Sequence, residues 1–295
     1  MSDSQYIIGN WGKCFLIFKS CYIKPPLFDF SGKMKARNTL YSDKNRLSCE
    51  HGLSTKFHDM NQKSTEDYLN ETKLAWFQNE VLDWAKENLR IFPWRSTKDP
   101  YQIFVAEFLL QQTDAARVVP IYKEFLSKYP NISEIAEASL SEIAEILKPL
   151  GFHYRASRLL LAIRLITKDT TYGGKIPNDE SRLLQLPGVG RYIARSVCAN
   201  AFDQSVAVLD TNVTRILQRF FGLKPQRARA RDDRSFWDYA QKVAPSTNVG
   251  LWNLALIDFG AIVCTFRKPR CSECPLQQQC NYYRQELIRI DPEEM

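Results

Sequence analysis

Apolar residues recur at helical spacing along most of the chain from about residue 70. Leu74, Phe77 and Val81 form one apolar stripe that runs to about Asn88. The stretch from Tyr101 to Gln112 is apolar on nearly every side, which predicts a helix buried all round. Further helices are expected over 118–129, 155–168, 181–186, 191–202, 212–221, 236–243 and 251–263. Because strand signals are almost absent, the pattern predicts an all-α fold.

Two short helices are expected between these segments. Ser133 and Ser141 each precede the sequence Glu-Ile-Ala-Glu, and serine is a preferred N-cap. The sequence therefore predicts that these two serines cap the two helices.

The first part of the chain follows neither the helical nor the strand period. It combines Pro25-Pro26 with polar stretches, which predicts a poorly ordered extension over residues 1–65. Met60 is an alternative start of translation, because the helical pattern begins soon after it. The longest apolar run near the start, residues 14–18, is too short for a signal peptide or a membrane span. We therefore expect no membrane association.

The net charge of +7 is unevenly distributed. Residues 1–60 hold nine Lys or Arg against five Asp or Glu, and the remainder holds 31 against 28. A basic balance fits a phosphate-bearing partner, but so small an excess also fits an ordinary solvated surface. With 44% hydrophobic and 25% charged residues, the composition is globular and excludes a collagen-like chain or one disordered throughout.

Four of the eight cysteines fall close together, in the pattern Cys264-x6-Cys271-x2-Cys274-x5-Cys280. Clustered thiols beside scattered ones indicate a metal site in a reducing compartment. Iron–sulfur clusters use compact runs of four cysteines, whereas structural zinc usually draws on two separated pairs. The spacing favours an iron–sulfur cluster and leaves zinc as the alternative.

Two segments carry groups that could bind phosphate. Gly188 and Gly190 flank Val189 between two short helices, which predicts a tight turn with positive φ, anchored to the core by Val189. Its backbone N–H groups beside a helix N-terminus would suit a DNA phosphate; a plain helix–helix turn is the alternative. The loop after the first clustered cysteine carries three cations that could contact phosphates or simply be solvated: Arg267, Lys268 and Arg270.

Two carboxylates stand out as candidates for catalysis. Asp210 ends an apolar run and opens a helix, where the helix N-terminus would keep it ionised and able to stabilise an oxocarbenium-like sugar. The alternative is that it serves only as an N-cap. Glu107 lies within an apolar helix, where burial would raise its pKa and suit a general acid. The alternative is that Glu107 forms a buried pair with a nearby arginine, such as Arg95.

The order of these segments resembles that of a DNA glycosylase. The resemblance is carried by Phe92-Pro93-Trp94-Arg95, Ala106-Glu107, Leu110-Gln111-Gln112-Thr113, the Leu-Pro-Gly-Val-Gly hairpin, Leu209-Asp210-Thr211-Asn212-Val213 and the four cysteines. Over about residues 70–284 the chain is similar to the helix-hairpin-helix, endonuclease III-like superfamily, in the branch of MutY and its mismatch-specific relatives.

The resemblance implies a two-domain helix-hairpin-helix glycosylase fold with a C-terminal iron–sulfur loop. Residues 90–205 would form a six-helix barrel domain that contains the hairpin. Residues 66–89 and 206–284 would form the second domain with a [4Fe-4S] cluster, followed by a tail over 285–295. MutY itself carries a C-terminal Nudix-like domain, which we expect to be absent here.

The resemblance also assigns roles to residues around a cleft into which a base is flipped. Glu107 matches the acid near the base, and Asp210 matches the essential aspartate at the sugar. Tyr192 falls where lyase relatives carry a Schiff-base lysine; because tyrosine cannot form an imine, we expect a monofunctional enzyme. The expected pocket and DNA-wedge residues are Trp94, Arg95, Gln112, Ala115, Asn212 and Leu254.

The identity of the base depends on departures from MutY. Leu254 stands where MutY has Gln or Glu to contact adenine, and Ala115 where it usually has Val. Both favour thymine or uracil opposite guanine, whereas Gln111-Gln112-Thr113 favours adenine opposite guanine or 8-oxoguanine. The alternatives are an endonuclease III-type lyase on oxidised pyrimidines and a non-catalytic iron–sulfur DNA-binding protein. The expected partner is double-stranded DNA with a mispaired or damaged base, bound by a monomer in the cytoplasm, at the nucleoid in a bacterium.

Overall fold

The structure is a computed structural model that describes residues 70–151 and 154–290. These residues belong to one compact unit, Leu53–Met295. The extension expected over residues 1–65 lies outside the described residues. In the described ranges the regular elements are α-helices and short 3₁₀-helices, without a strand, so the all-α prediction is confirmed.

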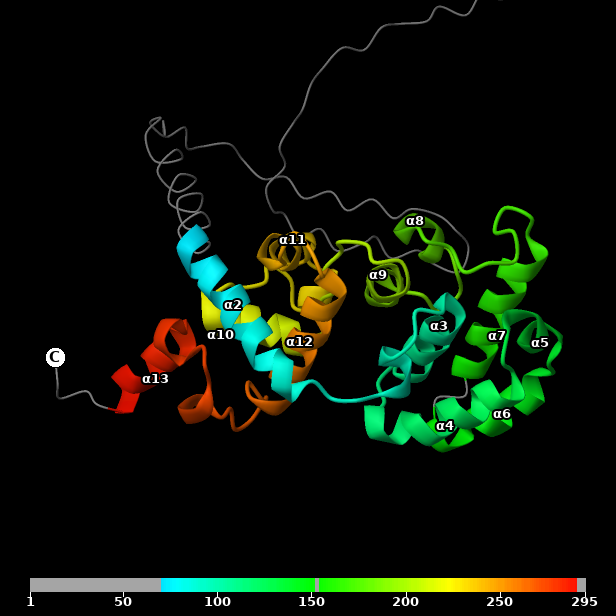
Figure 1. The fold of residues 1–295 in the computed structure, drawn as a ribbon, viewed down its shortest axis with the longest axis horizontal. Coiled ribbons are helices and arrows are strands. Elements are labelled where there is room, and N and C mark those ends of the chain that lie inside the picture. The colour runs from blue at the N-terminus through cyan, green and yellow to red at the C-terminus, as the bar shows by residue number, and fades with distance from the viewer. Residues whose placement is uncertain (1–69, 152–153, 291–295) are drawn as a thin grey trace, which may run out of the picture. The chain divides into compact units, whose positions relative to one another are not determined.

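The first hydrophobic core surrounds α3 (Pro100–Leu109); Figure 1 shows where this helix lies in the fold. Eight of the ten residues of α3 are buried, which confirms the helix predicted to be apolar all round. The other helices that contribute to this core are α4 (Ala115–Lys128), α5 (Ile132–Glu137), α6 (Leu140–Leu147), α7 (Tyr154–Lys168), α8 (Glu180–Leu183) and α9 (Arg191–Ala201).

The second core combines the first described helix with helices from the C-terminal third of the chain. They are α2 (Glu71–Asn88), α10 (Thr211–Phe221), α11 (Arg234–Val243) and α12 (Val249–Ile262). At its centre the ring of Phe77 contacts those of Phe220, Phe221 and Trp252. The two cores support the predicted division into two domains, which itself remains a prediction.

Short 3₁₀-helices connect these elements: η2 (Pro93–Arg95), η3 (Lys148–Leu150), η4 (Ala230–Asp232), η5 (Cys271–Glu273) and η6 (Gln277–Gln279). The last helix, α13 (Asn281–Ile290), packs on α10. It extends through residues 285–290, which the sequence had assigned to a tail; residues 291–295 lie outside the described ranges.

Most helix boundaries differ from the sequence prediction by one to three residues, and three of the differences have a local explanation. The caps of α5 and α6 are Asn131 and Ser139, two residues before the predicted serines. Asn131 Oδ1 accepts from two backbone N–H groups, and Ser139 forms a capping box with Glu142. In addition, α3 ends at Leu109 rather than at Gln112, whose φ of 53° is left-handed and incompatible with a continuing helix.

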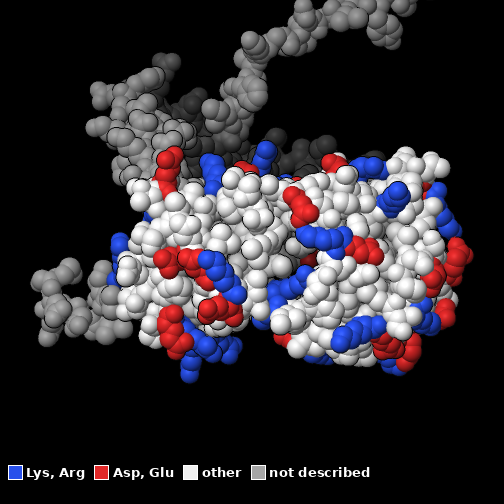
Figure 2. All heavy atoms as spheres, viewed as in Figure 1, with Lys and Arg blue, Asp and Glu red and all other residues white. Residues whose placement is uncertain are grey.

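Charged side chains of both signs are interspersed on the face shown in Figure 2, as expected from the small charge excess outside the first 60 residues. Among the described residues, no helix is both long and apolar enough to cross a membrane.

Candidate active site

A cavity of about 670 Å³ is lined by all but one of the catalytic and pocket residues predicted from the sequence. Its walls come from the segment around η2, from α3, from α9, from the start of α10 and from α12. The sequence-predicted residues that line it are Trp94, Arg95, Glu107, Ala115, Tyr192, Asp210, Asn212 and Leu254. Gln112 is not among the lining residues; it is exposed in the turn after α3.

Glu107 is buried, with 7% of its surface exposed. Ser196 Oγ on α9 donates to Glu107 Oε1 at 2.5 Å, whereas Oε2 has no hydrogen-bond partner. Burial raises the pKa of Glu107 to about 7, against the opposing effects of the Ser196 hydrogen bond and the Arg95 charge. At neutral pH a large fraction of this carboxyl group is therefore protonated and able to donate.

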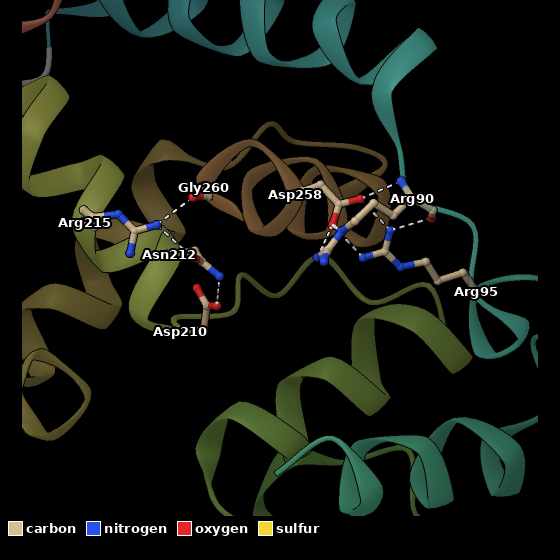
Figure 3. A network of polar contacts seen from close by, with 7 residues as sticks. All are labelled: Arg90, Arg95, Asp210, Asn212, Arg215, Asp258 and Gly260. Atoms are coloured by element: carbon tan, nitrogen blue, oxygen red, sulfur yellow. Dashed lines mark hydrogen bonds and ion pairs between the residues drawn. The ribbon is translucent and has the colours of Figure 1, made fainter. Parts of the chain in front are cut away.

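Arg95 is not the partner of Glu107. Its guanidinium donates to both oxygens of Asp258 on α12, at 2.7 and 3.0 Å. Arg90 donates to the same carboxylate from its backbone N–H at 2.8 Å and from Nε at 2.7 Å (Figure 3). The alternative of a buried Glu107–Arg95 pair is therefore wrong, because the guanidinium of Arg95 forms its bidentate hydrogen bonds with the carboxylate of Asp258.

Asp210 is the N-cap of α10, as predicted. Its Oδ1 accepts from Val213 N at 2.7 Å, and its Oδ2 accepts from Asn212 Nδ2 at 2.8 Å. Burial nevertheless raises the pKa of Asp210, while these hydrogen bonds and the Arg215 charge act to lower it. The sequence predicted only the lowering contribution of the helix N-terminus, because the depth of the cavity depends on the tertiary structure.

The side chain of Asn212 is held in place by a hydrogen bond from Arg215 (Figure 3). Arg215 Nη2 donates to Asn212 Oδ1 at 2.8 Å and to Gly260 O at 2.7 Å, and Arg215 Nε donates to Cys264 O at 2.7 Å. Gly260 on α12 permits this approach, since a Cβ there would lie 2.5 Å from Asn212 Cβ. The carboxylate of Asp210 is thereby positioned by contacts from two helices.

Tyr192 lies on α9 and contacts both hydrophobic cores. Its pKa is raised well above its ordinary value, first by burial and then by the negative charges of Glu107 and Asp210. The phenol therefore stays neutral beside the two carboxyl groups.

The turn that presents Gln112 is held by a buried arginine from α7. Arg155 Nη1 donates to Leu109 O at 2.7 Å, and its Nη2 donates to Gln111 O at 2.7 Å and to Thr113 Oγ1 at 2.9 Å. Two of these bonds satisfy backbone carbonyls at the end of α3 and in the turn after it. They fix the turn in which Gln112 adopts its left-handed backbone.

The glycine hairpin has the predicted geometry at one glycine. Gly188 has a φ of 83°, and a Cβ there would lie 3.0 Å from atoms of Phe108 and Arg158. Val189 is buried in the first core, as predicted. Gly190 has an ordinary φ of −99° and is the N-cap of α9, with no side chain to occupy the first backbone N–H groups. These groups are suited to an anion.

Two of the four clustered cysteines, Cys264 and Cys280, contact Arg219 near the end of α10. Arg219 Nη1 on α10 donates to Cys264 Sγ at 3.4 Å, and Cys280 Sγ donates to the carbonyl of Arg219 at 3.6 Å. Burial raises the pKa of Cys274 to about 12, and the neighbouring thiols at 264, 271 and 280 contribute to the rise. In the described ranges, no group of three or more His, Cys, Asp or Glu side chains is placed to hold a metal ion.

Four thiols of this kind are the ligands that iron–sulfur clusters use. The thiols influence one another's ionisation, and the cationic side chains of Arg215 and Arg219 lie near Cys264. Beside them, Arg267, Lys268 and Arg270 are exposed.

The structure adds residues that the sequence reasoning missed. Ser196 and Asn200 line the cavity at four-residue intervals after Tyr192, so helical spacing alone could have placed them on the same face of α9. Asp258 gave a weaker signal, as a single acid in an apolar helix. The role of Arg155 gave no sequence signal, because its acceptors lie more than 40 residues away.

Comparison with known proteins finds consistent relatives. The profile described as HhH-GPD superfamily base excision DNA repair protein matches residues 105–242. A thymine-DNA glycosylase of Aeropyrum pernix is 37% identical over 73% of this chain and 98% of its own. An adenine DNA glycosylase of Buchnera aphidicola is 31% identical over 71% of this chain and 60% of its own. The solved structure of a thermostable thymine-DNA glycosylase gives a TM-score of 0.69 at 35% identity, covering 74% of this chain and 99% of that one.

Proposed function

Because the chain belongs to the HhH-GPD superfamily of base excision DNA repair proteins, we propose that it flips a mispaired base out of double-stranded DNA and hydrolyses its N-glycosidic bond. The family expected from the motifs is confirmed. The observation that carries the proposal is that Glu107 and Asp210 line one cavity of about 670 Å³, a volume within the range of small-ligand pockets.

The two carboxyl groups suit different tasks. Glu107, with a pKa of about 7, can hold a proton at neutral pH and pass it to the departing base. Asp210 accepts two hydrogen bonds that favour its charged form, and a carboxylate at that position stabilises the positive charge that develops on the sugar. A pair of acids in unlike environments is a recurring arrangement in glycosidic bond cleavage.

We propose thymine or uracil opposite guanine as the base that is removed. Leu254 and Ala115 line the cavity and give it an apolar wall, which can contact the methyl group of thymine. The same wall leaves the nitrogens of adenine unpaired, at a cost of about 1–3 kcal/mol each. Weak pairing in T·G and U·G mismatches also lowers the cost of flipping.

Adenine opposite guanine or 8-oxoguanine is the second candidate. The raised pKa of Glu107 favours it, because adenine offers N7 as a proton acceptor. Thymine has no such nitrogen, so Glu107 would act on a carbonyl oxygen or through a water molecule.

The test is single-turnover cleavage, developed with alkali, on duplexes that contain T·G, U·G, A·G, A·8-oxoG or thymine glycol. We expect T·G and U·G to react at least about tenfold faster than A·8-oxoG, which corresponds to about 1.4 kcal/mol in the barrier. If A·8-oxoG reacts faster than T·G and U·G, the base that is removed is adenine. Tight binding without excision of any base would select the non-catalytic alternative.

Leu254→Gln examines the pocket wall directly. If this position sets the choice of base, the variant should move activity from thymine toward adenine. Leu184→Gln is the matched control: it makes the same chemical change at the exposed C-cap of α8, which does not line the cavity. An unchanged preference in Leu254→Gln would contradict the assignment.

We propose that strand cleavage does not accompany base removal. Tyr192 cannot form the imine that a lyase needs, and Lys98 is the lysine among the described residues that line the cavity. Lys98 Nζ is engaged with Asp203 at 2.6 Å. Borohydride should therefore trap no covalent DNA adduct; efficient trapping that Lys98→Ala abolishes would show a lyase and favour the endonuclease III-type alternative.

We also propose that Cys264, Cys271, Cys274 and Cys280 hold a [4Fe-4S] cluster. Such a cluster would fix the shape of the loop that presents Arg267, Lys268 and Arg270, which we assign, with the hairpin at residues 188–190, to DNA phosphates. Protein purified without oxygen should be brown and contain about four irons per chain. Cys274→Ser should lose iron, and Cys198→Ser should retain it. Stoichiometric zinc without colour would exclude the cluster.

The oligomeric state and the location of the protein remain predictions from the sequence: a monomer, in the cytoplasm.

A further inference from the structure

The two oxygens of Glu107 have different environments. Oε1 accepts a hydrogen bond from Ser196 Oγ at 2.5 Å. Oε2 is buried and has no hydrogen-bond partner among the described residues. A buried carboxyl oxygen without a partner is costly unless it carries a proton or meets a ligand. Since Glu107 and Ser196 both line the cavity, Oε2 is the oxygen left for a substrate atom or a water molecule.

A second hydrogen bond fixes the direction of the first. Asn200 lies one turn beyond Ser196 on α9, and its Nδ2 donates to Ser196 Oγ at 3.0 Å. An amide nitrogen can only donate, so the serine oxygen accepts from Asn200 while it donates its own proton to Glu107 Oε1. The backbone carbonyl of Asn200 in turn accepts from Lys98 Nζ at 3.1 Å, which ties this end of α9 to the segment before α3.

We propose that Ser196, oriented by Asn200, is a positioning residue that saturates Oε1 of Glu107 and so confines the transferable proton to Oε2. The inference rests on the proposed function. A carboxyl group that already accepts a hydrogen bond on one oxygen carries its proton on the other, because a proton on Oε1 would face the serine proton. After that proton has passed to the base, the serine O–H stabilises the carboxylate that remains.

The other groups that act on Glu107 cannot replace Ser196. Arg95, on η2, lowers the pKa of Glu107 through its charge, but its guanidinium is hydrogen-bonded to Asp258. Tyr192, one turn before Ser196, is neutral, and its own pKa is raised by burial and by the charges of Glu107 and Asp210. Ser196 is therefore the residue whose loss should change both the orientation and the ionisation of Glu107.

The test is the pH profile of single-turnover excision for the wild type and Ser196→Ala, on the best duplex of the panel above. Loss of the hydrogen bond should shift the alkaline limb of the variant upward by about one pH unit. The rate on the acidic plateau should fall about tenfold, because the carboxyl group loses its fixed orientation. Asn200→Ala, which keeps the serine but frees its hydroxyl, should change both quantities in the same direction by less.

Two controls separate positioning from a general effect on α9. Cys198→Ala also removes one buried heavy atom from this helix, and it does not line the cavity; it should leave the profile unchanged. Ser196→Thr keeps the hydroxyl and should restore the position of the limb. In a Glu107→Gln background Ser196→Ala should have no further effect, since its action passes through Glu107.

A wild-type profile in Ser196→Ala would overturn the inference while leaving the proposed function intact. Additive losses in the double variant would also overturn it. Failure of the proposed function would be seen separately, as absence of excision by the wild-type protein on every duplex.

Discussion

The carboxyl groups of Glu107 and Asp210 differ in their hydrogen bonds, and we propose that this difference makes Glu107 the acid and Asp210 the anion of the reaction. Both are displaced upward in pKa by burial, but only Asp210 has donors on both of its oxygens. Donors favour the charged form of a carboxyl group. The local hydrogen bonds therefore separate an acid from an anion, although burial acts on both.

Asp210→Asn is expected to abolish base excision while DNA binding survives. Asparagine keeps an oxygen for Val213 N, so the cap of α10 should persist. It removes the charge that stabilises the sugar cation, and single-turnover rates should fall at least about a hundredfold. Binding to a duplex with an uncleavable nucleotide should stay within a few-fold of the wild type. A variant with wild-type rates would remove Asp210 from the mechanism.

Excision should decline as the pH rises through about 7. In the proposed mechanism the acid form of Glu107 is the active one. The pKa of Glu107 is raised to about 7 mainly by burial, so the population of the acid form falls tenfold per pH unit above that value. Single-turnover rates between about pH 5.5 and 8.5 measure this limb. Glu107→Gln should lose activity, yet it should unfold at higher denaturant than the wild type at pH 8, because ionising a buried Glu107 destabilises the folded protein. A flat profile would show that Glu107 is not the acid.

The contact between α10 and α12 holds the carboxylate end of the site. Gly260 on α12 lies directly against Asn212, and Arg215 fixes both through its hydrogen bonds to Asn212 Oδ1 and Gly260 O. An N-cap alone would orient Asp210 only along its own helix. The second helix therefore supplies the remaining constraint.

Gly260→Ala should weaken both the fold and the reaction. Its Cβ would lie 2.5 Å from Asn212 Cβ, so α10 and α12 would have to separate, at a cost of about 1–3 kcal/mol in the free energy of unfolding. Excision should fall with it, because Asn212 would no longer hold Asp210. Adding Asn212→Gly, which removes the clashing side chain, should recover part of the stability without the activity. Wild-type stability and rate in Gly260→Ala would contradict this account.

The two hydrophobic cores are linked where the chain passes from α2 to α3. There the fully buried carboxylate of Asp258, from the second core, receives hydrogen bonds from Arg90 and Arg95 (Figure 3). Burial alone would raise the pKa of Asp258, but these hydrogen bonds hold it below its ordinary value. The network fixes one wall of the cavity, because Arg90 and Arg95 both line it.

Asp258→Asn should destabilise the whole protein by about 3–5 kcal/mol at pH 7, since it leaves two arginines facing a neutral group. Because the folded-state pKa is depressed, the wild-type contribution is complete above the ordinary aspartate pKa of about 3.9 and is lost as the pH falls through the lower folded value. Denaturant unfolding from about pH 7 to pH 2 measures this dependence, which the variant should lack. Asp203→Asn, at an exposed ion pair with Lys98, should cost less than about 1 kcal/mol. Equal losses in the two variants would contradict the role of the network.

The sequence alone determined the all-α class, most helices to within a few residues, the buried character of α3, the positive φ of Gly188 and the cap at Asp210. These features follow from side-chain periodicity and from local backbone chemistry, which act over a few neighbouring residues. The caps of α5 and α6, Asn131 and Ser139, were missed because several adjacent polar residues could serve as caps.

Only the tertiary structure decided which partner each buried polar group has. Glu107 lies 89 residues from Ser196, and Arg95 lies 163 residues from Asp258. From the sequence, Arg95 was a plausible partner for Glu107, because the two residues carry opposite charges and the sequence does not show which side chains lie close together. Buried polar groups must be satisfied by whatever packing brings within hydrogen-bond distance. In the folded protein Arg95 is hydrogen-bonded to Asp258, and Glu107 is hydrogen-bonded to the neutral hydroxyl of Ser196. The carboxyl group of Glu107 therefore has a pKa of about 7 and is able to donate a proton at neutral pH.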